Sequence, residues 1–147
     1  MKDFIEVRIL NAVRRLLSGS VNEILQETQF SIPLIEFGKC SGGSTVVPVV
    51  YLSTCERSEK ERIIRLDSYS LTITFSLVDT PESESHCYAY SAAVYKAIGE
   101  NPTLGGVAER AIINGKKYLP PKNPNCGEGW GVVISLRISV ESTDNVC

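Results

Sequence analysis

One continuous stretch, residues 69–106, constrains the fold more than any other part of the chain. Within residues 70–77 every second residue is apolar, which is the period of a strand with one buried and one solvent-facing side. The sequence therefore predicts a half-buried strand whose core side chains are Leu71, Ile73, Phe75 and Leu77.

A helix is predicted directly after this strand. Thr80 as N-cap, Pro81 at the first helical position and Glu82 in the first turn favour a helix start. Gly99 followed by Pro102 predicts the helix end. Apolar residues recur between these limits at the three- and four-residue spacing of a buried helical face, at Tyr90, Val94, Ala97 and Ile98.

Two other segments repeat these periodicities. Residues 4–17 carry a helical apolar stripe opposite polar side chains, and Gly19 is expected to end that helix. Residues 130–141 alternate as a second amphipathic strand, with one side formed by Trp130, Val132, Ile134, Leu136, Ile138 and Val140. With 147 residues the chain is long enough for one core, so we expect a single domain spanning residues 1–147.

A long hairpin is predicted to lead into the first strand. Residues 46–54 form a β-branched run, residues 55–61 a charged turn, and residues 62–66 a second extended segment. Residues 56–65 carry both signs of charge and are too polar on both sides to lie wholly on a core, so we expect them to project from the domain. A solvated hairpin tip without a partner is the alternative.

The remaining segments carry weaker signals. Residues 21–30 stay undecided between short helix and coil, and residues 31–37 contain a proline that permits an edge strand at best. Asn114-Gly115 is a tight-turn signal, which predicts either two short strands or one bulged strand in residues 107–118. Residues 119–129 are rich in Pro, Asn and Gly and predict a loop. The expected class is α+β, a mainly antiparallel sheet packed against an N-terminal and a central helix in an α/β sandwich.

Charge and cysteine usage exclude several classes of protein. Lys and Arg number 15 against 17 Asp and Glu, which indicates neither a nucleic-acid binder nor a polybasic membrane protein. No apolar run has the length of a signal peptide or membrane span, so a soluble, non-exported protein is expected. Five cysteines without a CxxC pair favour a reducing compartment over a disulfide framework.

No constellation of residues predicts catalysis, a cofactor or a metal. The single histidine, His86, neighbours Cys87, but adjacent helical residues diverge by about 100° and cannot form a dyad. Residues 38–45, GKCSGGST, lack the spacing of a phosphate-binding loop. We therefore expect a non-enzymatic interaction protein. The competing class is an enzyme or small-ligand protein in which residues 38–45 and His86 line one pocket.

Three segments together resemble the tail terminator, or tail completion, proteins of long-tailed bacteriophages and prophages. They are RLDSYSLTITFSL at residues 65–77, SAAVYKAIGENPTLGG at residues 91–106 and GWGVVISLRISVE at residues 129–141, preceded by the amphipathic N-terminal helix. The resemblance covers most of the chain and is weakest over residues 21–45.

The resemblance implies a structural protein of the virion tail, assembled in the host cytoplasm. Such a protein forms a hexameric ring on the head-proximal end of the tail tube, stops tube polymerisation and joins the tail to the head connector. Its partners are its own copies, the tube protein and a connector or stopper protein, with DNA only passing through the lumen. Another tail or head-connector component is the alternative within this assembly.

A ring of identical subunits needs two different complementary patches on each copy. The charged hairpin offers one candidate patch. We expect intersubunit or tube contacts from four of its residues, Glu59, Glu61, Arg62 and Arg65.

Overall fold

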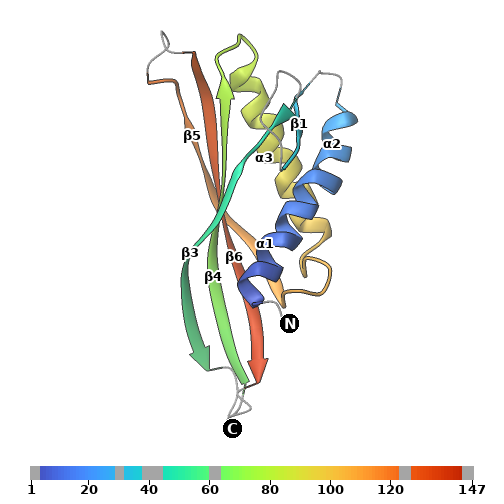
Figure 1. The fold of residues 1–147 in the computed structure, drawn as a ribbon, viewed down its shortest axis with the longest axis vertical. Helices are drawn as coiled ribbons and strands as arrows, with labels where there is room; N and C mark the ends of the chain where they lie inside the picture. The colour runs from blue at the N-terminus through green and yellow to red at the C-terminus, as the bar shows by residue number, and fades with distance from the viewer. Residues whose placement is uncertain (1–3, 29–31, 38–44, 60–63, 123–126, 144–147) are drawn as a thin grey trace.

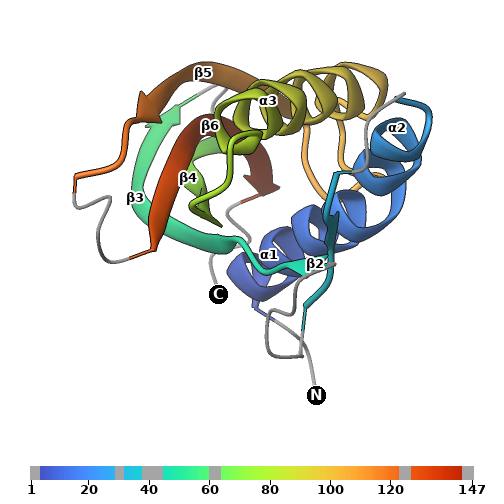
Figure 2. The same cartoon turned by 90° about the horizontal axis from the view of Figure 1, so that it is seen from above.

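The computed structural model describes residues 4–28, 32–37, 45–59, 64–122 and 127–143 and has the predicted α+β fold. One antiparallel sheet is covered on one side by helices (Figures 1 and 2). The elements in chain order are α1 (Ile5–Leu16), the π-helical turn η1 (Leu17–Val21), α2 (Asn22–Gln26), β1 (Leu34–Ile35), β2 (Thr45–Val46), β3 (Val49–Glu59), β4 (Ile64–Val78), α3 (Ser83–Glu100), β5 (Arg110–Leu119) and β6 (Glu128–Thr143).

The four long strands pair in the order β3-β4-β6-β5, and every pair is antiparallel. The two strands predicted from alternation, β4 and β6, lie side by side at the centre, with Leu71 opposite Leu136 and Ile73 opposite Ile134. All four side chains are fully buried beneath the helices. The period-2 prediction is therefore confirmed on both strands, because alternate residues face the helical layer.

The N-terminal helix does not end at Gly19. The chain continues through η1 into α2, so the ambiguous residues 22–26 are helical. Leu17, Val21 and Leu25 are all buried, and the π turn keeps this row against the core. Burial of three large apolar side chains outweighs the helix cost of one glycine, which is about 1 kcal/mol.

Helix α3 has the predicted buried face but different ends. It starts at Ser83 rather than after Thr80, whose carbonyl accepts the Ser83 N–H at 3.1 Å in a preceding turn. It runs through Gly99 to Glu100, and the Asn101 side-chain amide donates to the Ala97 carbonyl at 2.9 Å. The same carbonyl also accepts the Asn101 backbone N–H at 3.0 Å, so Asn101 caps the helix end with both its backbone and its side chain.

One further prediction for the strands needs correction. Asn114-Gly115 is not a tight turn, because β5 stays paired with β6 throughout and the extra residue forms a bulge between Ile113 and Gly115. The bulged-strand alternative is therefore correct. Within the described residues 32–37 the strand is β1, which pairs in parallel with β2 outside the main sheet.

Three strands continue beyond the end of the helical layer (Figure 1). The predicted hairpin of β3 and β4 forms this extension, and it projects as expected. β6 joins it as a third strand, since Arg65 pairs with Ser142 and Ile64 with Thr143. β6 therefore runs two residues past the predicted strand end at residue 141, and residues 144–147 lie outside the described part.

Candidate assembly surface

Of the four residues expected to form assembly contacts, Glu59 lies at the end of β3 and Arg65 near the start of β4, both in the extension. Glu61 and Arg62 are outside the described residues, as is the side chain of Glu59. The backbones of Glu59 and Arg65 are cross-strand partners, so the hairpin brings these two of the four predicted residues opposite each other. Their role in assembly remains a prediction.

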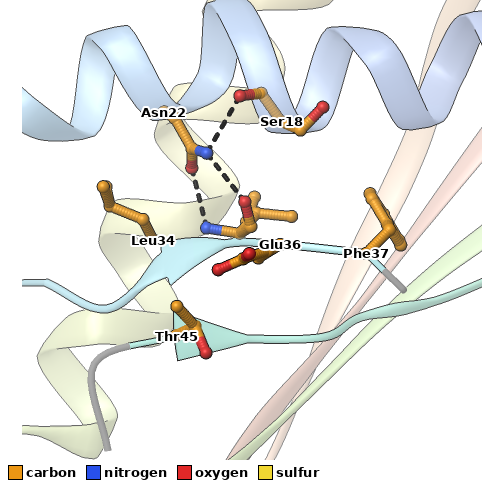
Figure 3. Close-up of a pocket in the computed structure, with 7 residues that line it drawn as sticks. Ser18, Asn22, Leu34, Glu36, Phe37 and Thr45 are labelled. Atoms are coloured by element: carbon orange, nitrogen blue, oxygen red, sulfur yellow. Dashed lines mark hydrogen bonds between the residues drawn. The ribbon is translucent and has the colours of Figure 1, made fainter. Parts of the chain in front are cut away.

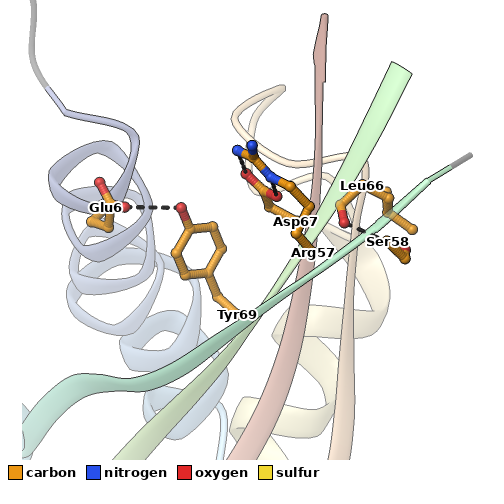
Figure 4. Close-up of polar contacts among 6 residues, drawn as sticks. All are labelled: Glu6, Arg57, Ser58, Leu66, Asp67 and Tyr69. Carbon is orange, nitrogen blue, oxygen red and sulfur yellow. Dashed lines mark hydrogen bonds and ion pairs between the residues drawn. The ribbon is translucent and has the colours of Figure 1, made fainter. Parts of the chain in front are cut away.

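A different ion pair stabilises the extension. Arg57 on β3 and Asp67 on β4 are cross-strand partners, and the guanidinium donates to both carboxylate oxygens, at 2.7 and 3.1 Å (Figure 4). Asp67 is buried whereas the Arg57 side chain is 57% exposed. Such a two-point contact is stronger than an ordinary surface pair because it fixes both groups in one plane.

The extension is also joined to the first turn of the N-terminal helix. Tyr69 of β4 donates its hydroxyl to Glu6 of α1 at 2.9 Å (Figure 4). Burial of the ring, and secondarily this hydrogen bond, raises the pKa of the Tyr69 hydroxyl well above its ordinary value. The phenol therefore remains a hydrogen-bond donor throughout the physiological pH range.

The face of the sheet opposite the helices carries short polar side chains. No described element covers this face (Figures 1 and 2). The polar half of the alternation on the two central strands lies here, as predicted, and consists of Ser68, Ser70, Thr72, Thr74 and Ser76 on β4 and Ser135, Arg137 and Ser139 on β6. We call it the uncovered face.

Some of the exposed large apolar residues lie on the two outer strands of the sheet. On β3, Val49 is 60% and Tyr51 46% exposed, and on β5 Ile112 is 41% exposed. Two tyrosines of α3, Tyr88 and Tyr95, are 46% and 40% exposed. Aromatic residues exposed in this way are enriched in protein interfaces relative to other surfaces.

A lysine on β5 lies against one tyrosine of α3 and one of β5. The Lys116 ammonium lies 4.8 Å from the ring centroid of Tyr95 and 5.6 Å from that of Tyr118. The Tyr118 ring contacts Tyr88 edge to face, with centroids 4.9 Å apart. These contacts orient the three tyrosine rings and the lysine ammonium beside the edge of β5.

The structure places His86 and Cys87 as consecutive residues of α3 with different environments. His86 is partly exposed, whereas Cys87 is fully buried in the core. Burial, with a smaller contribution from Glu84, raises the pKa of the Cys87 thiol to about 11. This thiol is therefore protonated at neutral pH and unsuited to act as a nucleophile. Within the described ranges, no group of three or more His, Cys, Asp or Glu side chains could hold a metal ion.

An open pocket of about 560 Å³ lies between the η1–α2 segment and β1 (Figure 3). Its principal polar side chain, Asn22, is already engaged: it donates to the carbonyls of Ser18 and Ile35 at 3.0 and 2.8 Å and accepts from the Ile35 N–H at 2.8 Å. Thr45 lines the pocket, but His86 does not. Residues 38–44 of the glycine-rich loop lie outside the described part. His86 therefore does not share this pocket with Thr45, the one residue of that loop that the structure describes.

The fold and these surfaces define a small α+β protein with an uncovered sheet face and a three-stranded extension. Neither a scan against protein-family models nor a search of curated proteins finds a match. Among the helices of the described ranges, none combines the length and apolar character needed to span a bilayer.

Sequence reasoning missed the Arg57–Asp67 and Glu6–Tyr69 contacts. The first depends on the hairpin register, which the charged turn leaves open by one or two residues. The second joins segments 63 residues apart and needs the packing of α1 on the sheet. The tyrosine spacing of seven on α3 was readable, since residues 88 and 95 lie on one helical face.

Proposed function

We propose that this protein is a structural component of a phage tail that caps the head-proximal end of the tail tube as a ring. In this role it ends tube polymerisation and joins the tail to the head connector. The resemblance over residues 65–77, 91–106 and 129–141 supports the proposal, and these segments form the centre of the fold.

The observation that carries the proposal is the combination of an uncovered sheet face with an extension that leaves the helical layer. The projecting extension leaves strand edges open to unwanted pairing, from which a protein acting alone gains little. A subunit of a ring uses such surfaces, since it needs two different patches for its neighbours and further surface for the tube and the connector.

The proposed partners are further copies of this chain, the tube protein and a connector or stopper protein. The ring is proposed to be hexameric, with DNA passing through its lumen. The slightly acidic net charge of −2 is compatible with a lumen that does not retain DNA. The proposed location is the virion tail, after assembly in the host cytoplasm.

Electron microscopy of purified protein mixed with tail tubes tests the proposal. Gold-labelled protein should bind one end of each tube, and it should stop elongation when added to polymerising tube protein. Heat-unfolded protein is the control. Labelling along the tube wall would instead favour another tail component, and unlabelled tubes that elongate normally would contradict the proposal.

A further inference from the structure

The main sheet ends in two edge strands of nearly equal length. β3 has 11 residues and β5 has 10, and each contains one bulge. In the described part of the chain, β3 has only β4 as a strand partner and β5 has only β6. Exposed edges of this length invite pairing with another chain unless something covers them.

The strand directions make the two edges compatible with each other. The four strands alternate in direction, so β3 and β5 run in opposite directions. A second copy placed beside β5 in the same orientation therefore presents its β3 antiparallel to that strand. The antiparallel order of the strands therefore continues from one copy into the next.

Opposite charges occupy the two ends of one row across the sheet. Glu56 pairs with Ser68, Ser68 with Ser139, and Ser139 with Arg110. Side chains of one cross-strand row point to the same face, here the uncovered face. Glu56 and Arg110 are both exposed, so this row begins with a carboxylate at the β3 edge and ends with a guanidinium at the β5 edge.

The charges of the two edge strands differ in sign. β5 contains Arg110, Lys116 and Lys117 and no carboxylate. β3 contains two glutamates, and its single cation, Arg57, is matched by Asp67 at 2.7 Å. A contact between two β5 edges would bring cations together, whereas contact between β5 and β3 brings opposite charges together.

We infer that a second copy of this chain packs its β3 edge against β5 in head-to-tail fashion, with Glu56 of that copy beside Arg110. This inference deepens the proposed function by naming the surfaces that join neighbouring subunits, and it rests on that function for its biological setting. The Ala111 N–H already donates to the Pro102 carbonyl at 2.7 Å. Because this N–H is already bonded within its own chain, side chains rather than backbone hydrogen bonds join the two copies near Ala111.

Charge exchange on the full-length chain tests the contact. Arg110→Glu leaves carboxylates at both ends of the row, and Glu56→Arg leaves cations at both ends. We expect each variant alone to weaken self-association by about tenfold in sedimentation velocity. Mixing the two variants should restore association, because each supplies the charge that the other lacks. Glu23→Arg, which reverses an exposed charge on α2 outside the main sheet, is the matched control and should associate like the wild type.

Three results would overturn the inference. They are a wild-type chain that stays monomeric at about 1 mM, an Arg110→Glu variant that associates normally, and a control variant as defective as the edge variants. Tail-tube binding separates this inference from the proposed function. If both edge variants cap tubes as well as the wild type does, the inferred contact is wrong and the proposed function stands. If the mixture associates again but leaves tubes uncapped, the contact stands and the proposed function is wrong.

Discussion

Tyr69 donates its hydroxyl to Glu6 at 2.9 Å, although 63 residues separate them in the chain (Figure 4). The tyrosine is buried in the sheet and the glutamate is exposed on the first turn of α1. The contact therefore fixes the start of the helical layer to the strand that continues into the extension. It lies at the border between the covered and the projecting parts of the sheet.

Replacing Tyr69 by phenylalanine should lower the free energy of unfolding by about 1 kcal/mol, because one hydrogen bond is lost while the ring stays in place. Urea unfolding followed by circular dichroism measures this change. Tyr51→Phe is the control, since that side chain is 46% exposed on the uncovered face. A loss as large in Tyr51→Phe as in Tyr69→Phe would contradict the assigned role.

Two glycines should respond to alanine in opposite directions. A Cβ at Gly129 would lie 2.6 Å from the carbonyl oxygen of Val78, where β4 and β6 approach at an irregular pairing. We expect Gly129→Ala to cost about 2–3 kcal/mol. A Cβ at Gly99 meets nothing within 4 Å in the last turn of α3, so Gly99→Ala should stabilise by about 0.5–1 kcal/mol. Thermal unfolding of both variants checks the pair, and equal signs would refute it.

Stability should fall above pH 9 in part through Cys87. Its pKa rises from 9.0 to about 11 on folding, so below pH 9 the thiol is protonated in both states. Between these values only the unfolded chain releases the proton, and the free energy of unfolding falls as pH rises, by about 3 kcal/mol in total.

Urea unfolding between pH 8 and pH 10.5, about the range of this titration, measures the Cys87 contribution. Cys87→Ala should show a shallower decline than the wild type, whatever its cost at neutral pH. The matched control is Cys55→Ala, because Cys55 is exposed. Parallel curves for the wild type and Cys87→Ala would show that this thiol does not contribute.

Removing the guanidinium of Arg57 should destabilise the extension. Arg57→Ala leaves the buried Asp67 carboxylate without its two-point donor, at an expected cost of about 1–2 kcal/mol. The double variant Arg57→Ala/Asp67→Ala should lose less than the sum of the single variants, with a coupling of about 1 kcal/mol. Faster hydrogen exchange of the β3 amides in Arg57→Ala would locate the destabilisation in the extension. If the unfolding free energies lost by the two single variants add up to the loss in the double variant, the pair contributes no interaction energy.

Periodic burial was the most readable property of the sequence. Ile73 and Ile134 illustrate this, because each lies in an alternating run whose apolar side could only be buried beneath a helical layer. The α+β class, the central strands and the buried face of α3 followed from such runs. Burial of an entire row involves many square ångströms of apolar surface, so no local preference of a single residue overrides it.

Single turn-favouring residues were less reliable. Gly19 and Gly99 lie inside helices and Asn114-Gly115 inside a strand, since the apolar residues on either side continue the same buried rows. The charged row from Glu56 to Arg110 was also unreadable, because it depends on the register of three strand pairs. A shift of one residue in any of them would place either charge on the other face.

The last described strand of the chain occupies a central place in the sheet. β6 lies between β4 and β5, so neither of these can complete its pairing until residues 128–143 have left the ribosome. We expect nascent chains that lack this segment to expose the apolar rows of β4 and to require chaperones. Synthesis order thus delays the finished sheet, and with it any premature association of subunits, until residues 128–143 have been made.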